Sequence, residues 1–231
     1  MSPTAPERLP LFPLGTALVP GMDLPLHIFE ERYRRLMEDR RGNDPIFGVV
    51  LIRAGREVVD RPEVHRIGTA ASLIEATEHA DGRYSIVVRG GRRFRVLDED
   101  WSRTYLTAAV EWLDEPTGDA ERCRAFADGV THRWRKFVIA LARLVGDPEE
   151  AEAIGDLLVA RLPSDPTERC YEIIGQLPVP AGTRQQLLEL PTTERRLQAL
   201  YDLLESERRL MTAFGTAPTL SYATNQSPRP N

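Results

Sequence analysis

The sequence predicts an α+β protein in which a β-rich domain over residues 9–115 is followed by a helical bundle over residues 119–214. Three observations support this prediction. In the first half, apolar residues recur at strand spacing, with turn signals between the runs. In the second half they recur at helical spacing. A polar stretch containing proline and glycine, residues 114–119, separates the two halves.

The chain opens with two short extended runs that lead into an amphipathic helix. Prolines interrupt these runs, and because proline cannot donate to a sheet ladder, we expect the strands at the rim or edge of a barrel. These prolines are Pro13, Pro20 and Pro25. From residue 28 the period becomes helical. We therefore expect Phe29 and Tyr33 to pack in the core, with Glu30 and Arg34 as an i,i+4 pair.

The remaining strands of the first half are each bounded by turn signals. Asp81-Gly82 is a strong hairpin signal because both positions favour positive φ, and Gly90-Gly91 predicts a further turn or a bulge. The expected strands are Ile46–Ile52, Gly68–Glu75, Tyr84–Val88, Arg93–Leu97 and Tyr105–Trp112. Five or six strands with short turns and one early helix indicate a small, partly closed barrel.

Apolar stripes separated by prolines predict the helices of the second half. The clearest start signal is Asp165-Pro-Thr-Glu168, which combines a capping carboxylate, proline at the first helical position and glutamate at the third. Residues 1–8 are expected to be a flexible N-terminus. Residues 215–231, rich in Thr, Ser and Pro, are expected to be a disordered tail.

The composition excludes several classes of protein. A net charge of −5 argues against a general nucleic-acid binder. No apolar run approaches the roughly 20 residues that span a membrane, and the N-terminus lacks the order of a signal peptide, so a cytoplasmic location without membrane attachment is expected. Cys123 and Cys170 lack metal-ligand spacing and are interpreted as partly buried thiols.

No catalytic, cofactor-binding or metal-binding residue is assigned from the sequence. No pair of histidines has the spacing of a metal motif, so the histidines are interpreted as solvated or capped. They are His27, His65, His79 and His132. The G-x-S-x-G motif of a nucleophile elbow does not occur.

Four arginines form the main local positive feature: Arg89, Arg92, Arg93 and Arg95. They could contact an anion or RNA, with Phe94 as a stacking surface. The alternative is a half-buried strand whose outer face is charged and paired with Asp98 or Glu99, and the strand alternation by itself favours this alternative.

The opening Leu9-Pro-Leu-Phe-Pro-Leu-Gly15, followed by Pro20–Arg34, resembles the start of the N-terminal substrate-binding domain of the Lon protease family. Gly82–Val96 and Tyr171–Pro178 also resemble that domain. The resemblance covers roughly residues 9–214 and is weaker around 53–66 and 116–160. It implies a PUA-like β pseudo-barrel followed by an α-helical bundle subdomain.

In full Lon proteases this domain precedes an ATPase with a Walker motif and a Ser–Lys protease. Both activities need a lysine in a defined place, and Lys136 is the only lysine of this chain. It lies in a predicted helix without a glycine loop. The resemblance therefore implies a protein that is not an enzyme and needs no cofactor.

The function that the resemblance implies is recognition of unfolded or degron-bearing polypeptides on an apolar groove. The candidate groove residues are Leu14, Val19, Met22, Leu24, Phe29 and Tyr33. Two alternatives stay open. One is RNA binding by a PUA-like protein through the arginine cluster, against which the acidic balance argues. The other is an adaptor or scaffold that docks on a dedicated protein partner. No oligomeric state is predicted.

Overall fold

The computed structural model describes residues 7–39, 46–54, 61–145 and 149–214 of an α+β chain. The chain divides between Asp114 and Glu115 into two compact units, which we call the sheet unit and the helical unit. The predicted flexible N-terminus, as far as residue 6, and the predicted tail over 215–231 lie outside the described residues. Glu7 and Arg8, which were predicted to be flexible, instead begin the first strand.

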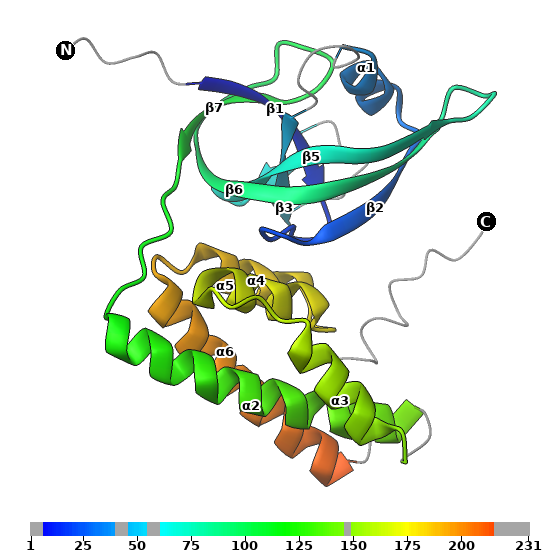
Figure 1. Ribbon diagram of the computed structural model, residues 1–231. Helices are drawn as coiled ribbons and strands as arrows, with labels where there is room; N and C mark the ends of the chain where they lie inside the picture. Colours follow the sequence, from blue (N-terminus) through cyan, green and yellow to red (C-terminus); the bar gives the residue numbers. More distant parts are fainter. Residues whose placement is uncertain (1–6, 40–45, 55–60, 146–148, 215–231) are drawn as a thin grey trace. The chain divides into compact units, whose positions relative to one another are not determined.

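The sheet unit is a mixed sheet in which five strands close into a ring (Figure 1). In order around the ring these are β1 (Glu7–Leu14), β7 (Thr107–Trp112), β6 (Tyr84–Asp100), β5 (Ile67–Glu78) and β3 (Ile46–Ala54). The ring closes where β3 pairs with β1 in parallel. The short β4 (Glu63–Val64) pairs with β3, and β2 (Asp23–Ile28) pairs with β6. Within the described sheet, β6 is the single neighbour of β2.

The pairing of β1 explains how this strand tolerates two prolines. Pro10 lies opposite Thr107 of β7, whereas Pro13 lies opposite Val50 of β3. Because each half of β1 is paired on one side, a proline nitrogen on the other side removes no ladder hydrogen bond. Pro25 lies in β2, which has one neighbour, so the predicted edge position of this proline is confirmed.

β6 runs as one strand through Gly90 and Gly91, where the sequence predicted a turn or a bulge. Opposite Thr69–Ala71 of β5, β6 has one extra residue, which defines a β-bulge. Gly90 is required there because a Cβ on it would lie 2.1 Å from the carbonyl oxygen of Val19. The predicted hairpin at Asp81-Gly82 is confirmed, with Gly82 at a φ of +76°.

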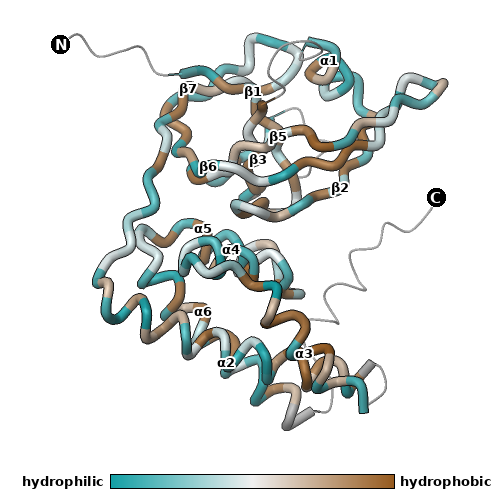
Figure 2. Tube along the Cα trace, in the orientation of Figure 1, coloured by the Kyte–Doolittle hydropathy of each residue, from teal (hydrophilic) through white to brown (hydrophobic). Residues whose placement is uncertain are grey.

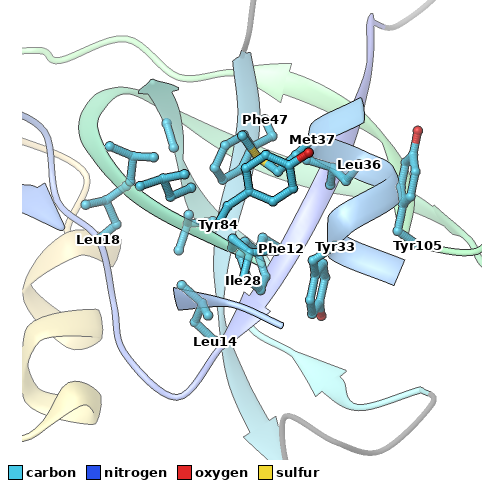
Figure 3. Close-up of a cluster of buried hydrophobic side chains, with 14 residues drawn as sticks. Phe12, Leu14, Leu18, Ile28, Tyr33, Leu36, Met37, Phe47, Tyr84 and Tyr105 are labelled. Carbon is cyan, nitrogen blue, oxygen red and sulfur yellow. The ribbon is translucent and has the colours of Figure 1, made fainter. Parts of the chain in front are cut away.

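Helix α1 (Glu31–Asp39) packs on the sheet through its apolar face. Its Tyr33 lies with its ring centroid 3.9 Å from that of Phe12, and the Tyr105 hydroxyl donates to Asp39 at 2.7 Å. Leu36 completes this buried face. The surrounding core, drawn in Figure 3, also includes Leu14, Leu18, Ile28, Met37, Phe47 and Tyr84.

Phe29 was predicted to be a core contact of this helix, and that prediction is wrong. The helix begins at Glu31, and Phe29, which precedes it, is 62% exposed. The predicted Glu30–Arg34 pair is also wrong. Glu30 pairs with Arg32 at 2.7 Å, and Arg34 pairs with Glu31 at 3.6 Å. Glu30 lies just before the helix, where its carbonyl accepts the N–H groups of Tyr33 and Arg34, and its carboxylate is engaged by Arg32 instead of Arg34.

The described part of the helical unit holds five helices, and α1 brings the number among the described residues to six. They are α2 (Ala120–Val145), α3 (Ala151–Ala160), α4 (Pro166–Gln176), α5 (Ala181–Glu189) and α6 (Thr193–Phe214). The long helices α2 and α6 lie side by side (Figure 1). The predicted cap of α4 is confirmed, because the Asp165 carboxylate accepts the N–H groups of Thr167 and Glu168 and Pro166 is the first helical residue.

Residues that were predicted to be a linker are bound to the start of α6. The N–H groups of Thr193 and Glu194 donate to the carbonyls of Pro116 and Thr117, each at 3.0 Å. The Glu194 carboxylate in turn accepts the N–H of Asp119 at 3.1 Å. The segment after the unit boundary is therefore part of the helical unit.

Arg196 of α6 is fully buried and joins three helices to this segment. Its Nε and Nη2 donate to the carbonyls of Leu187 and Leu190 at the end of α5, at 3.2 and 2.8 Å. Its guanidinium lies 4.4 Å from the ring centroid of Tyr171 in α4. Nη2 is also 3.3 Å from the carboxylate of Glu115, which the Tyr171 hydroxyl contacts as well.

Hydrophobic residues extend along much of α3 (Figure 2), and two of them face solvent. Ile154 is 39% exposed and Leu157 is 51% exposed. None of the helices in the described ranges is both long enough and apolar enough to cross a membrane.

Candidate functional site

Among the strands that the structure describes, β2 pairs with β6 alone, so its other edge is open, and apolar side chains lie along it and beside it. The Gly90 N–H donates to the carbonyl of Met22 at 2.9 Å, which sets the phase of the ladder between β2 and β6. In an antiparallel pair, the backbone groups of alternate residues face the partner strand. The backbone groups that therefore point away from β6 are those of Asp23, Pro25 and His27.

The six candidate groove residues divide into two groups of different accessibility. Leu14, Val19 and Tyr33 are at most 6% exposed, and Figure 3 shows Leu14 and Tyr33 inside the core. A ligand on the surface does not reach these three. Met22 and Leu24 are partly buried and pack against the same core from β2 and the residue before it. Together with the exposed Phe29, which follows β2, they remain accessible within this strand and at its two ends.

The four arginines of the predicted cluster do not form one basic patch. The Arg89 guanidinium binds both carboxylate oxygens of Asp23 at 2.7 Å, and Arg95 binds Glu111 at 2.6 Å. Arg93 is buried and donates to the carbonyl of Asp114 at 3.4 Å, so the charged face that the strand alternation predicts is not exposed at this position. Arg92 lies 5.3 Å from the ring centroid of Trp112. Asp98 and Glu99 were the expected partners of these arginines. Instead, Arg89 pairs with Asp23 of β2, and Arg95 pairs with Glu111 of β7.

Two histidines that are far apart in the sequence converge on one hydroxyl. Ser85 Oγ lies 2.8 Å from Nε2 of His79 and 3.2 Å from Nδ1 of His27. Ser85 lies directly opposite His27 in the β2–β6 register, and His79 follows β5 at the adjoining hairpin. The hairpin signal could have placed His79 near Ser85. No sequence signal paired β2 with β6, so the cluster was missed.

An open cavity of about 540 Å³ lies between α2 and α6 and is lined by charges of both signs. Its Glu205 accepts hydrogen bonds from Arg208, Arg209 and Arg133. The bond from Arg208 is the largest of the causes that lower the pKa of Glu205 to about 2. Since this carboxylate stays ionised at neutral pH, it does not serve as a general acid. The remaining lining residues are Tyr201, Asp202, Ser206 and Leu210.

The two cysteines are free thiols, and both are buried. Burial raises the pKa of the Cys170 thiol to about 12 and also raises that of Cys123. Neither thiol is therefore a nucleophile at neutral pH. Among the described residues there is no group of three or more His, Cys, Asp or Glu side chains placed to hold a metal ion.

The family model for the ATP-dependent protease La (LON) substrate-binding domain matches residues 8–206, and so includes both units. The chain belongs to this family. The resemblance in the opening motif is thereby confirmed.

Lon protease 2 of Syntrophobacter fumaroxidans is 29% identical over 195 residues, which are 84% of this chain and 24% of that protein. The Lon protease of Escherichia coli K12 is 24% identical over 217 residues, which are 91% of this chain and 26% of that protein. The chain thus spans about a quarter of the length of these curated relatives.

Two solved Lon N-terminal domains share the fold over most of their length. A Lon N-terminal domain protein from Xanthomonas campestris superposes with a TM-score of 0.55 at 25% identity, covering 84% of this chain and 96% of that one. The N-terminal domain of the Mycobacterium avium complex Lon protease gives a TM-score of 0.61 at 21% identity, covering 86% and 98%. The order of a mixed sheet followed by helices is therefore that of Lon N-terminal domains.

Proposed function

We propose that this chain is a non-catalytic module that recognises extended, apolar segments of polypeptide, such as unfolded proteins or degrons. The observation that carries the proposal is the open edge of β2, with accessible apolar side chains at both ends. Met22 precedes the strand and Phe29 follows it, while Leu24 lies within it. Membership of a family defined as a substrate-binding domain of a protease supports the same class of ligand.

An extended peptide can add to β2 as a further strand. The backbone groups of Asp23, Pro25 and His27 that point away from β6 include two N–H donors, since proline has none. A peptide strand uses such donors and acceptors for affinity, and its alternate side chains dock on apolar neighbours. Pro25 supplies a carbonyl acceptor but no N–H, so the ladder that a peptide forms with β2 lacks one donor at its middle.

The residues present support a recognition role without chemistry. Lys136 is the only lysine of the sequence, so the chain supplies neither a Walker lysine at a glycine loop nor a lysine near a serine nucleophile. The carboxylate of Glu205 is held ionised by arginines, and Cys170 is held protonated by burial.

The proposal is tested by fluorescence anisotropy of the purified chain with labelled unfolded polypeptide and with labelled single-stranded RNA, at low and at moderate salt. Binding to polypeptide that tolerates salt supports the proposal, because apolar docking and backbone hydrogen bonds are screened little. Salt-sensitive binding to RNA alone overturns the proposal, since contacts between arginine and phosphate weaken steeply with salt. Binding to neither probe also overturns it.

Phe29→Asp tests the position of the groove. A phenyl ring buried on binding contributes about 1.5–3 kcal/mol, so the variant is expected to bind polypeptide roughly 10-fold more weakly or worse. Leu97→Asp is the matched control, because Leu97 of β6 is a similarly exposed apolar residue at 50%. Equal affinity of both folded variants would show that the groove is elsewhere.

His27→Pro tests the edge itself. The His27 N–H points away from β6, so proline removes a donor from the open edge and leaves the ladder to β6 intact. His27→Ala, which keeps that N–H, is the control. We expect weaker polypeptide binding by the proline variant and unchanged binding by the alanine variant. The same affinity for both would argue against strand addition at β2.

The exposed face of α3 supports a second candidate function, an adaptor that docks on a larger protein partner. Ile154 and Leu157 expose apolar surface on this helix. A pull-down in which Leu157→Asp, but not Phe29→Asp, loses a captured partner would favour the adaptor over polypeptide recognition.

A further inference from the structure

We propose that His27 and His79 form a surface site for a late first-row divalent metal ion, such as Zn²⁺, Ni²⁺ or Cu²⁺. The basis is the convergence of two imidazole nitrogens on the same hydroxyl. Nδ1 of His27 and Nε2 of His79 both lie within hydrogen-bond distance of Ser85 Oγ, at 3.2 and 2.8 Å. The site uses side chains on the outer face of β2, β6 and the β5–β6 hairpin, whereas strand addition of a polypeptide uses backbone groups at the edge of β2.

The backbone holds the two imidazoles on the same side of three adjacent strands. His27 lies opposite Ser85 across β2 and β6, and Thr77 lies opposite Ser85 across β5 and β6. His79 is two residues beyond Thr77, and side chains two residues apart in an extended strand share a face. Its N–H donates to the carbonyl of Arg83 at 2.8 Å, which fixes its position across the hairpin.

The small side chain between the imidazoles makes room for an ion. An ion coordinated by histidine lies about 2.0–2.1 Å from each nitrogen, so the two nitrogens must approach each other by rotation of their side chains. Both histidines are exposed and Ser85 is half-buried. Their hydrogen bonds therefore exchange with water at low cost, and the serine hydroxyl can rotate away or remain as a weak third donor.

The donor set selects the class of ion. Imidazole suits Zn²⁺, Cu²⁺ and Ni²⁺, whereas Mg²⁺ and Ca²⁺ prefer carboxylate and carbonyl oxygens. The nearby carboxylate of Asp81 is engaged by Arg83, whose Nε donates to it at 2.7 Å. Two imidazoles therefore supply the main protein ligands, and water completes the coordination shell. This agrees with the lack of any cluster of three or more such residues in the described part of the chain.

The chain offers its own matched controls, because it has four histidines. Tag-free protein is titrated calorimetrically with ZnCl₂, and CuCl₂ is added for electron paramagnetic resonance, in which nitrogen superhyperfine lines report imidazole ligands. We expect one ion for each chain with two nitrogen ligands. His27→Ala and His79→Ala should each weaken binding by at least the roughly 10–100-fold that loss of an outer-shell partner costs in established sites. His65→Ala and His132→Ala should bind as the unmodified protein does.

The outcomes separate the proposal from adventitious binding. Selective loss in the His27 and His79 variants, with one nitrogen remaining in the copper spectrum, supports the site. The proposal is overturned if the His27 and His79 variants bind the metal ion as tightly as the unmodified protein does. It is also overturned if all four histidine variants lose affinity for the ion equally. MgCl₂ competing with ZnCl₂ at equal concentration would overturn the assigned class of ion. Each exposed-residue variant is checked for an unchanged circular dichroism spectrum, so a folding defect is not mistaken for loss of a ligand.

Discussion

Replacing Arg196 by alanine should destabilise the helical unit more than replacing any exposed arginine of α6. Arg196 is fully buried, and its Nε and Nη2 donate to the carbonyls of Leu187 and Leu190. The same guanidinium contacts the Tyr171 ring and the Glu115 carboxylate. Alanine removes the guanidinium donor from these carbonyls and from this carboxylate, which keeps its contact with the Tyr171 hydroxyl, and it leaves a cavity beneath the helix.

The expected loss is about 3 kcal/mol in the free energy of unfolding. A hydrogen bond from a charged donor contributes about 1.5–3 kcal/mol, so the two carbonyl contacts account for about 3–6 kcal/mol. One opposing effect reduces this. Nη1 is buried without a hydrogen-bond partner among the described residues, and its removal relieves a desolvation cost of about 1–3 kcal/mol. The result agrees with the roughly 3–5 kcal/mol lost when one partner of a buried pair is removed.

Urea denaturation followed by far-ultraviolet circular dichroism measures this loss, because most of the helical signal comes from the helical unit. Arg195→Ala is the control: Arg195 is the preceding residue of the same helix and is exposed. It should change the unfolding free energy by less than about 0.5 kcal/mol. If the two variants differed by less than about 1 kcal/mol, the reasoning that Arg196 organises this unit would be refuted.

Three further predictions concern the two units separately. Gly90→Ala should destabilise the sheet unit by about 1–3 kcal/mol, because the new Cβ would lie 2.1 Å from a backbone oxygen. Gly182→Ala in α5 is the control: its Cβ meets nothing within 4 Å, and it should stabilise the helical unit by about 0.5–1 kcal/mol. Urea midpoints that shift in the same direction for both variants would contradict this prediction. The pKa of Glu205 is about 2 against an ordinary 4.5, so this carboxylate stabilises the fold above pH 4.5 and loses that effect as pH falls toward 2. The difference in unfolding free energy between the unmodified chain and Glu205→Gln should therefore shrink over that interval, and a constant difference would disprove the assignment. Finally, a thiol reagent at mildly alkaline pH should label Cys123 and Cys170 only after urea is added, because burial raises the pKa of each; labelling of the native chain would show that they are accessible.

The fold could be predicted where local chemistry determines structure. The hairpin at Asp81-Gly82 and the cap at Asp165 depend on residues close in sequence, and both are present. The sequence could not distinguish a bulge from a turn at Gly90, because the need for glycine there comes from the carbonyl of Val19, which is far away in the sequence. The start of α1 was predicted too early, because the helical pattern of apolar residues begins before the helix itself. Phe29 fits the helical period, but the helix begins two residues later, at Glu31.

The candidate site was predictable only in part, because accessibility depends on how the ring closes. The apolar pattern near the start identified residues that contact one another, yet it did not distinguish Leu14, which fills the core, from Leu24, which lies at the edge. The alternation along β6 likewise predicted a charged outer face but not the burial of Arg93. These differences arise from pairings between strands far apart in the sequence, which a local pattern does not contain.

His27 belongs to both proposed sites, and its two roles can be separated because they use different groups. Strand addition uses its backbone N–H at the open edge, whereas metal binding uses its imidazole on the face of the sheet. His27→Ala should therefore lose the metal ion and keep the polypeptide, while His27→Pro should lose both. His79→Ala, which lies away from the edge, should lose only the metal ion. Measuring both ligands on all three variants tests this, and a loss of polypeptide binding in His79→Ala would show that the two sites are not independent.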